Sequence, residues 1–477
     1  MTLVARVPPG CPSERQYVLT VLFWDFLGVP INVIVEERLD TIIEDSDGPG
    51  RSLVLADTFF SRAAAEWLAP SSLPVAPLAT FNLPPDLRLS RNDRLEVVFG
   101  RELRCGGFVR EDEAGIELGV DVVGSAFFML SRYEEAASLV RDKFGRFPAA
   151  ASIASKGSFL DRPLVNEYLE VLWHCAERLW PRLTRRRRSS RLFLTHDVDL
   201  PCCRYRVPAL AVLRHAMGDV VHRRDLLTAR KRARSLLARE NGPYDDPCYT
   251  FPMLMALSER HGLRSTFNFL SDSQGNNQDG FYGLDDSYIQ RLIADIARRG
   301  HEIGYHASST AATRPALIET EFSRLREVAV RVGALQDEWG GRYHYLRWSP
   351  LESWAAWDRV GLTYDSTLGY PEAAGFRTGC CYEYPVYDLL NRRPLRLRER
   401  SLAVMDVTLF SHVYQSFGFT QARDEVVKLA KQCWRFDGDL VLLWHNDTLI
   451  RPEHGRFLSD LIEELRMLQN SRQRYDH

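Results

Sequence analysis

The second half of this chain alternates short apolar runs with helical stretches, and this alternation restricts its possible folds more than any other feature. Two of the stretches between the runs carry apolar residues at helical spacing and stop at a glycine, namely Ser287–Arg299 before Gly300 and Leu317–Val332 before Gly333. The candidate strands are Leu192–Leu194, Ser265–Leu270, Glu302–Tyr305, Tyr343–Leu346, Leu402–Met405 and Leu440–Leu443. Such alternation predicts an α/β fold, either layered or closed into a barrel.

Polar residues follow most of these candidate strands directly. In parallel α/β sheets and barrels the carboxyl ends of the strands build the active site, so residues far apart in sequence can converge there. The residues concerned are Asp197 and Asp199 after the first strand, His306 after the third, Arg347 after the fourth, Asp406 after the fifth and His445 after the last. We therefore expect one polar site at the carboxyl ends of the strands.

A run of arginines separates this regular half from the residues before it. The chain has 477 residues, too many for one ordinary core, and "LTRRRRSSR" provides the clearest seam. We predict a smaller N-terminal α+β domain over residues 1–184 and a basic linker over 185–190. A barrel domain would then occupy residues 191–477, with a helical insertion at about 204–245.

Composition excludes several classes of protein. A formal charge of −2 gives no reason to expect a nucleic-acid partner, and no apolar run has the length of a membrane span. Nine cysteines occur without any Cys-x-x-Cys spacing, which indicates reduced, buried thiols rather than a zinc or redox motif. We expect a cytoplasmic protein, while the sequence does not indicate its oligomeric state.

The pair Asp197 and Asp199, in "THDVD", requires something positive nearby, such as a metal ion, an arginine or a proton. Three chemistries use such a pair: phosphoryl transfer through an aspartyl phosphate, glycosyl transfer from a nucleotide sugar, and metal-dependent hydrolysis. Leu200 and Pro201 replace the small hydroxyl residue typical of the first, and the second leaves the histidines unexplained. Hydrolysis uses ligands, a base and an acid, and the chain offers all three.

Five segments carry a resemblance to a known family. "THDVD", "GHEIGYH", "HYLRWSP", "YDSTLGY" and "LLWHND" resemble, in order and approximate spacing, the polysaccharide deacetylase (NodB-homology) superfamily. The resemblance covers roughly residues 191–465 and implies a distorted α/β barrel that removes acyl groups from amino sugars. In the N-terminal half, "FFMLSRYEEA" and "GRFPAAAS" resemble the extra domain of a divergent bacterial branch of this superfamily.

The resemblance also implies a role for individual residues. Asp197 matches the general base, Arg347 the arginine that pairs with it, and His445 the histidine that protonates the departing amine. Asp199 and His306 match metal ligands.

The metal motif departs from the family pattern at one position. The second histidine of the common motif is replaced by Thr310, and catalytic zinc usually has three protein ligands. We expect His344 to supply the third ligand to a divalent ion, with zinc favoured and cobalt or nickel as alternatives.

These observations favour a metal-dependent enzyme that removes an N-acyl group, with acetyl expected, from an amino sugar in a polysaccharide or its precursor. Two alternatives stay open. One is a catalytically degenerate protein that binds a glycan without hydrolysing it. The other is a phosphoryl or glycosyl transferase that holds its metal with the Asp-x-Asp pair.

Overall fold

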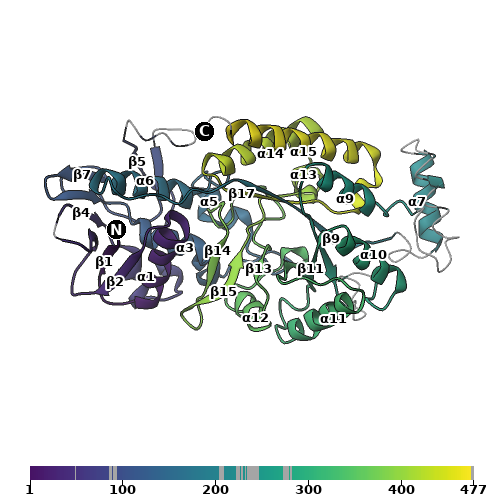
Figure 1. Cartoon of the computed structure of the whole chain (residues 1–477), viewed down its shortest axis with the longest axis horizontal. Coiled ribbons are helices and arrows are strands. Elements are labelled where there is room, and N and C mark those ends of the chain that lie inside the picture. The colour runs from purple at the N-terminus through teal and green to yellow at the C-terminus, as the bar shows by residue number, and fades with distance from the viewer. Residues whose placement is uncertain are drawn as a thin grey trace.

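The computed structural model describes residues 1–48, 50–84, 87, 89, 94–202, 209–221, 226, 229–230, 233, 246–271, 279 and 282–473. Two large β-sheets, one in each half of the chain, lie along the longest axis of the molecule (Figure 1). Within the described residues, no helix combines the length and apolar character needed to cross a bilayer.

The N-terminal sheet is mixed and has the strand order β2-β1-β3-β4-β8-β7. Its strands are β1 (Leu3–Val7), β2 (Ile31–Val35), β3 (Thr41–Asp45), β4 (Ser52–Leu55), β7 (Val109–Asp112) and β8 (Gly115–Leu118), and β5 (Ala79–Asn82) pairs with β6 (Arg94–Val97). The helices include α1 (Pro12–Leu19), α2 (Phe59–Ala65), α3 (Val122–Leu130), α4 (Tyr133–Ala137), α5 (Ile153–Lys156) and α6 (Leu164–Leu179). One cluster of buried apolar side chains extends through both halves of the chain, so the boundary at 185–190 stays a prediction.

The C-terminal sheet curls into an open barrel with the strand order β14-β15-β13-β12-β11-β10-β9-β17-β16. Its strands are β9 (Arg191–Val198), β10 (Thr266–Leu270), β11 (Glu302–Ala307), β12 (Gly340–Tyr343), β13 (Tyr364–Asp365), β14 (Tyr384–Asp388), β15 (Arg393–Glu399), β16 (Val404–Met405) and β17 (Asp439–Leu443). Every pair is parallel except β14 with β15. The α/β class predicted for this half is confirmed, although β14 and β16 are edges and do not pair with each other.

Helices cover the outside of this sheet (Figure 1). They are α9 (Phe251–Arg260), α10 (Ser287–Arg298), α11 (Leu317–Arg331), α12 (Ser353–Arg359), α13 (Asp406–Phe410), α14 (Phe419–Arg435) and α15 (Pro452–Gln473). The two predicted helices thus end within a residue of their expected positions. Much of the predicted insertion at 204–245 lies outside the described residues, and α7 (Ala209–Val221) is its described helix.

One strand prediction was wrong in its boundaries. Strand β12 ends at Tyr343, and the residues expected to continue it, His344–Leu346, form a single 3₁₀ turn. Tyr345 (φ 60°) and Leu346 (φ 54°) adopt left-handed backbone conformations, which are incompatible with a strand. This early end brings His344 and the residues before it to the carboxyl end of the sheet.

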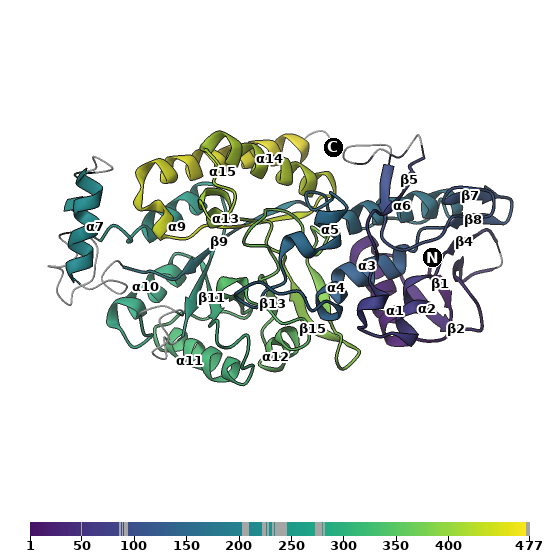
Figure 2. The same cartoon turned by 180° about the vertical axis from the view of Figure 1, so that it is seen from behind.

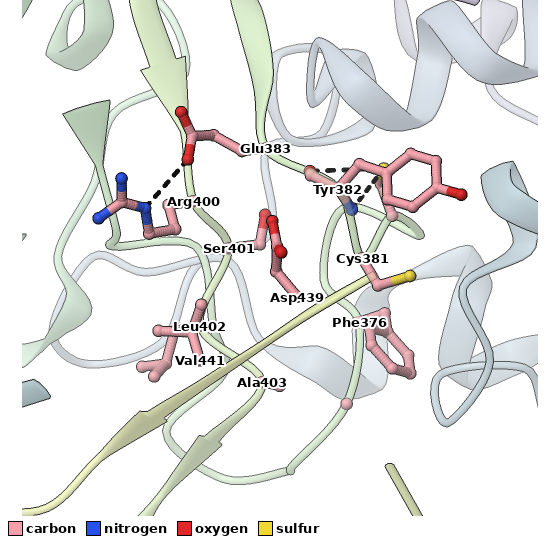
Figure 3. Close-up of a pocket in the computed structure, with 12 residues that line it drawn as sticks. Phe376, Cys381, Tyr382, Glu383, Arg400, Ser401, Leu402, Ala403, Asp439 and Val441 are labelled. Atoms are coloured by element: carbon pink, nitrogen blue, oxygen red, sulfur yellow. Dashed lines mark hydrogen bonds and ion pairs between the residues drawn. The ribbon is translucent and has the colours of Figure 1, made fainter. Parts of the chain in front are cut away.

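A small cavity lies near the amino ends of β9 and β17. Figure 3 shows Glu383 and Arg400 paired at its wall, with Asp439, the first residue of β17, among the other lining residues. Asp439 in turn accepts two hydrogen bonds from Arg191, the first residue of β9. The acidic groups that line this cavity are therefore paired with arginines. The cavity lies at the opposite end of the strands from the predicted site.

Candidate metal centre

Asp197 emerges near the end of β9 and is buried against two neighbouring strands. Its Oδ1 accepts hydrogen bonds from Asn268 Nδ2 in β10 at 2.7 Å and from Arg342 Nη1 in β12 at 2.9 Å. Burial alone would raise the pKa of Asp197, but the adjacent Arg342 guanidinium outweighs it and holds that pKa below its ordinary value. Asp197 is therefore an ionised carboxylate held in one orientation by two hydrogen bonds.

The arginine beside Asp197 is Arg342, which corrects the expected pairing with Arg347. Arg342 is fully buried and also donates to Ser366 O at 2.7 Å. The Arg347 guanidinium instead donates to the carbonyl of Ser309 at 3.2 Å. Because β12 ends at Tyr343, Arg342 occupies the strand position from which a side chain reaches Asp197.

Asp199, His306 and His344 come together as a possible metal-binding group, with one candidate ligand atom from each within 4.8 Å of the others. The Nε2 atom of His306 lies 3.2 Å from Asp199 Oδ1, and Nε2 of His344 lies 3.5 Å from Asp199 Oδ2. The structure thus brings the three predicted ligands to one point, His344 included.

Hydrogen bonds to the opposite ring nitrogens hold both imidazoles in this orientation. The Nδ1 atom of His306 lies 2.8 Å from the carbonyl oxygen of Arg342, and Nδ1 of His344 lies 3.1 Å from Asp279 Oδ1. A carboxylate or carbonyl at Nδ1 leaves Nε2 available as a ligand, the arrangement usual around metal-binding histidines. Thr310, in place of the missing motif histidine, donates to Asp279 Oδ2 at 3.3 Å and so supports the same carboxylate.

The donor atoms fit a divalent cation. Within the described part of the chain, the buried atoms Asp199 Oδ1 and His306 Nε2 make no well-directed hydrogen bond, although buried polar atoms normally have a partner. Burial would raise the pKa of Asp199, but His344 and then His306 outweigh it and hold that pKa well below its ordinary value. Two imidazoles and one carboxylate with room for a further ligand form the donor set of catalytic zinc sites.

His445 approaches the same carboxylate from β17, with its Nε2 3.7 Å from Asp199 Oδ2. Its Nδ1 lies 2.7 Å from Oδ1 of the fully buried Asp406, which also accepts from the His445 backbone N–H at 2.9 Å. Burial would lower the pKa of His445, but the Asp406 carboxylate outweighs it and raises that pKa to about 10. The Asp406 carboxylate therefore favours the protonated form of His445.

Sequence reasoning missed three members of this site: Arg342, Asn268 and Asp279. Asn268 was detectable, since it is a polar residue within the otherwise apolar "TFNFL" strand. Asp279 follows the polar stretch "SDSQGNNQ", which carries no strand or helix pattern, so no signal singled it out. The aromatic residue beside the site, Tyr345, is exposed and stacks on His344 with ring centroids 4.1 Å apart.

A family model matches the N-terminal half of the chain. Residues 3–181 match the family described as "Family of unknown function (DUF7033)". No curated protein matches the chain.

Among solved structures, a polysaccharide deacetylase of Mycobacterium smegmatis aligns with 58% of this chain and 84% of its own, at 17% identity and a TM-score of 0.38. The Xyl-CE4 domain of a multidomain xylanase from the hindgut metagenome of Trinervitermes trinervoides aligns with 59% of this chain and 85% of its own, at 12% identity and a TM-score of 0.29. Puue allantoinase aligns with 58% of this chain and 83% of its own, at 12% identity and a TM-score of 0.34. These likenesses are loose, and the function is inferred from the side chains of the site.

Proposed function

We propose that this chain is a metal-dependent hydrolase that removes an N-acyl group, with acetyl expected, from an amino sugar of a polysaccharide or its precursor. The observation that carries the proposal is the arrangement around Asp199. A possible metal-binding triad includes Asp199 and His306, and the carboxylate of Asp197 lies with its Oδ2 3.8 Å from His306 Nε2. His445 Nε2 lies 3.7 Å from Asp199 Oδ2, and Asp406 favours the protonated form of this histidine. A hydrolase needs these three components within reach of one bond.

Asp199, His306 and His344 would hold the ion. A divalent cation bound there supplies a Lewis acid that acidifies a water molecule and polarises an amide carbonyl. Asp197 then accepts the proton of the attacking water while Arg342 and Asn268 keep its carboxylate ionised and oriented. As the carbon–nitrogen bond breaks, His445 donates its Nε2 proton to the departing amine, and Asp406 stabilises the ring through Nδ1. The products are a carboxylic acid and a free amine.

The donor set bears on the transferase alternative. Magnesium and manganese, which bridge phosphates in such enzymes, prefer oxygen ligands, whereas imidazole favours zinc, cobalt or nickel. Two of the three candidate ligands here are histidines. A protein that only binds glycans has no use for a base and an acid on either side of such a group, which counts against the other alternative.

The direct test is release of acetate from oligomers of N-acetylglucosamine by protein loaded with zinc, cobalt or nickel. We expect acetate from the wild type, and a rate at least about 10²-fold lower from Asp197→Asn with its metal content unchanged. If metal-loaded wild type binds the oligomers but releases no acyl group from any acetylated amino sugar offered, hydrolysis is wrong and glycan binding becomes the better account.

A further inference from the structure

The turn that carries His344 has an unfavourable backbone. Tyr345 (φ 60°, ψ 12°) and Leu346 (φ 54°) follow His344 directly, and neither is a glycine. A left-handed conformation costs a residue with a side chain about 1–2 kcal/mol. Two such residues in succession persist only where the surrounding structure holds them, and they often occur at functional sites.

Leu346 packs against Leu402, Met405, Val441 and Leu443 of the C-terminal half, whereas Tyr345 is contacted by the N-terminal half of the chain. Arg146 Nη1 donates to the carbonyl oxygen of Tyr345 at 2.9 Å. The Phe144 ring lies nearly parallel to that of Tyr345, with centroids 5.9 Å apart and 6° between the planes. Since Tyr345 stacks in turn on His344 at 4.1 Å, a continuous series of contacts runs from Phe144 to the candidate ligand.

The segment that supplies these contacts, the Asp142–Arg146 loop, is itself tightly held. Asp142 accepts hydrogen bonds from the backbone N–H of Phe144 at 2.8 Å, and from the backbone N–H and Nε of Arg146 at 2.9 and 2.8 Å. The Arg146 guanidinium is buried and lies 4.7 Å from the centroid of the Phe144 ring. Arg146 and Phe144 are therefore presented to Tyr345 in fixed positions.

The loop belongs to the chain between α4 and α5, which lie beside the C-terminal sheet (Figure 2). A second contact follows it, where the Ala149 backbone N–H donates to Glu372 Oε1 at 2.6 Å. The N-terminal half therefore does more than pack against the C-terminal sheet, because it also contacts the turn that carries a candidate ligand.

We propose that Arg146 and Phe144 are positioning residues for the metal centre. They hold the left-handed turn at Tyr345 and thereby fix the imidazole of His344 toward Asp199. The N-terminal half thus completes the site of the C-terminal half. This inference rests on the proposed function, because it takes His344 as a ligand of the ion.

The test is zinc affinity of the full chain, measured by competition with a chromogenic chelator, together with the visible spectrum of the Co²⁺-loaded protein. We expect Arg146→Met to bind zinc at least about 10-fold more weakly and to change the Co²⁺ spectrum, since altered support of a ligand typically costs 10–100-fold in affinity. Arg146→Lys, which keeps a donor for the Tyr345 carbonyl, should recover part of the loss. The matched control is Arg141→Ala, because Arg141 donates to the Glu135, Ser138 and Val140 carbonyls, and it should match the wild type.

Phe144→Ala provides a second variant that does not depend on a buried side chain, because Phe144 is 38% exposed. It should also weaken zinc binding and alter the Co²⁺ spectrum, even if Arg146→Met fails to fold. Zinc affinity within about twofold of wild type in Phe144→Ala and in every folded Arg146 variant, with unchanged spectra, would overturn this inference alone. A wild type that binds neither ion would overturn the proposed function and this inference with it.

Discussion

Two groups of buried charge in this molecule are neutralised in different ways. At the junction of the two halves, Glu135 lies between Arg132 and Arg377, and both of its carboxylate oxygens accept hydrogen bonds from guanidinium groups at 2.6–2.9 Å. At the carboxyl ends of β9, β11, β12 and β17, Asp199 faces His306, His344 and His445, and one of its oxygens makes no well-directed hydrogen bond within the described residues. Permanent arginine charges neutralise the carboxylate of the junction cluster (Arg132, Glu135 and Arg377), while Asp199 at the candidate metal centre is faced by histidines, whose charge depends on a bound proton.

This difference distinguishes the junction cluster from the candidate metal centre. Burial would raise the pKa of Glu135, but Arg377 and Arg132 outweigh it and lower that pKa, so the cluster needs no ligand. At the metal centre, burial would lower the pKa of His344, but Asp199 outweighs it and raises that pKa to about 9. Within the described residues, Asp199 Oδ1 has no well-directed hydrogen bond, and the histidines that face this carboxylate can bind a divalent cation once they have lost their protons.

The largest expected effect tests whether charge at the site serves chemistry rather than folding. His445→Gln removes the proton donor but keeps a side-chain N–H for Asp406, so the deacylation rate constant kcat should fall about 10²–10⁴-fold. Zinc affinity should stay near the wild-type value, because His445 is not one of the candidate ligands. Steady-state kinetics and chelator competition measure both, and a variant with wild-type kcat would show that His445 is not the acid.

The junction cluster predicts the opposite result. Arg377→Met leaves the buried Glu135 with one guanidinium instead of two, so the free energy of unfolding should fall by about 3 kcal/mol. Urea denaturation measures the loss, while the zinc affinity of the folded protein should not change. A folded Arg377→Met variant of wild-type stability that has lost zinc would reverse the distinction between the two clusters.

A smaller effect on zinc affinity is expected from a change at Asp279, the carboxylate beside His344 Nδ1. Asp279→Asn removes the negative charge beside His344 Nδ1 but keeps an oxygen able to accept its proton. Zinc affinity should therefore fall about 10-fold, the lower end of the range for such supporting groups. Chelator competition decides, with Asp285→Asn, an exposed carboxylate elsewhere on the barrel, as the control.

A third buried group extends the comparison, because its two carboxylates are stabilised by protonation. Asp365 and Glu399 are register partners in β13 and β15 and are fully buried. Burial raises the pKa of Asp365 from 3.8 to about 6, and burial followed by repulsion from Asp365 raises that of Glu399 well above its ordinary value. The folded state therefore holds protons that the unfolded chain releases, and stability should fall as the pH rises from about 4 through 6.

Asp365→Asn should remove part of this pH dependence. The variant should be about 1–2 kcal/mol more stable than wild type at pH 7–8, with an advantage that shrinks toward pH 4. Urea denaturation across this pH range measures the difference. An advantage of equal size at pH 4 and pH 8 would show that the pair is not held by protons.

The sequence predicted much of the C-terminal sheet because its strands are apolar and its helices end at glycines. Five of the six candidate strands overlap a strand of the structure substantially or fully, and the sixth, Tyr343–Leu346, was displaced toward its carboxyl end. The family resemblance led us to expect Arg347 beside Asp197, and the structure has Arg342 there instead. Non-glycine residues in left-handed conformation, as at Tyr345 and Leu346, carry no local sequence signal, so the early end of β12 was not predictable.

The contacts between the N-terminal half and the turn that carries His344 could not be predicted from the sequence either. Phe144 and Arg146 lie about 200 positions before Tyr345, in a loop without periodic pattern, and only the packing of the two halves brings them together. The three predicted ligands, by contrast, converge because each lies at the carboxyl end of a parallel strand of one sheet.

The most direct test of this account is the metal content of the purified protein by elemental analysis. Wild type after incubation with zinc should carry about one equivalent, and Asp199→Asn, His306→Gln and His344→Gln should each lose most of it. His301→Gln, at the amino end of the strand that carries His306, should retain it. A metal-free wild type, or triad variants that keep a full equivalent, would contradict the assignment of Asp199, His306 and His344 as a metal centre.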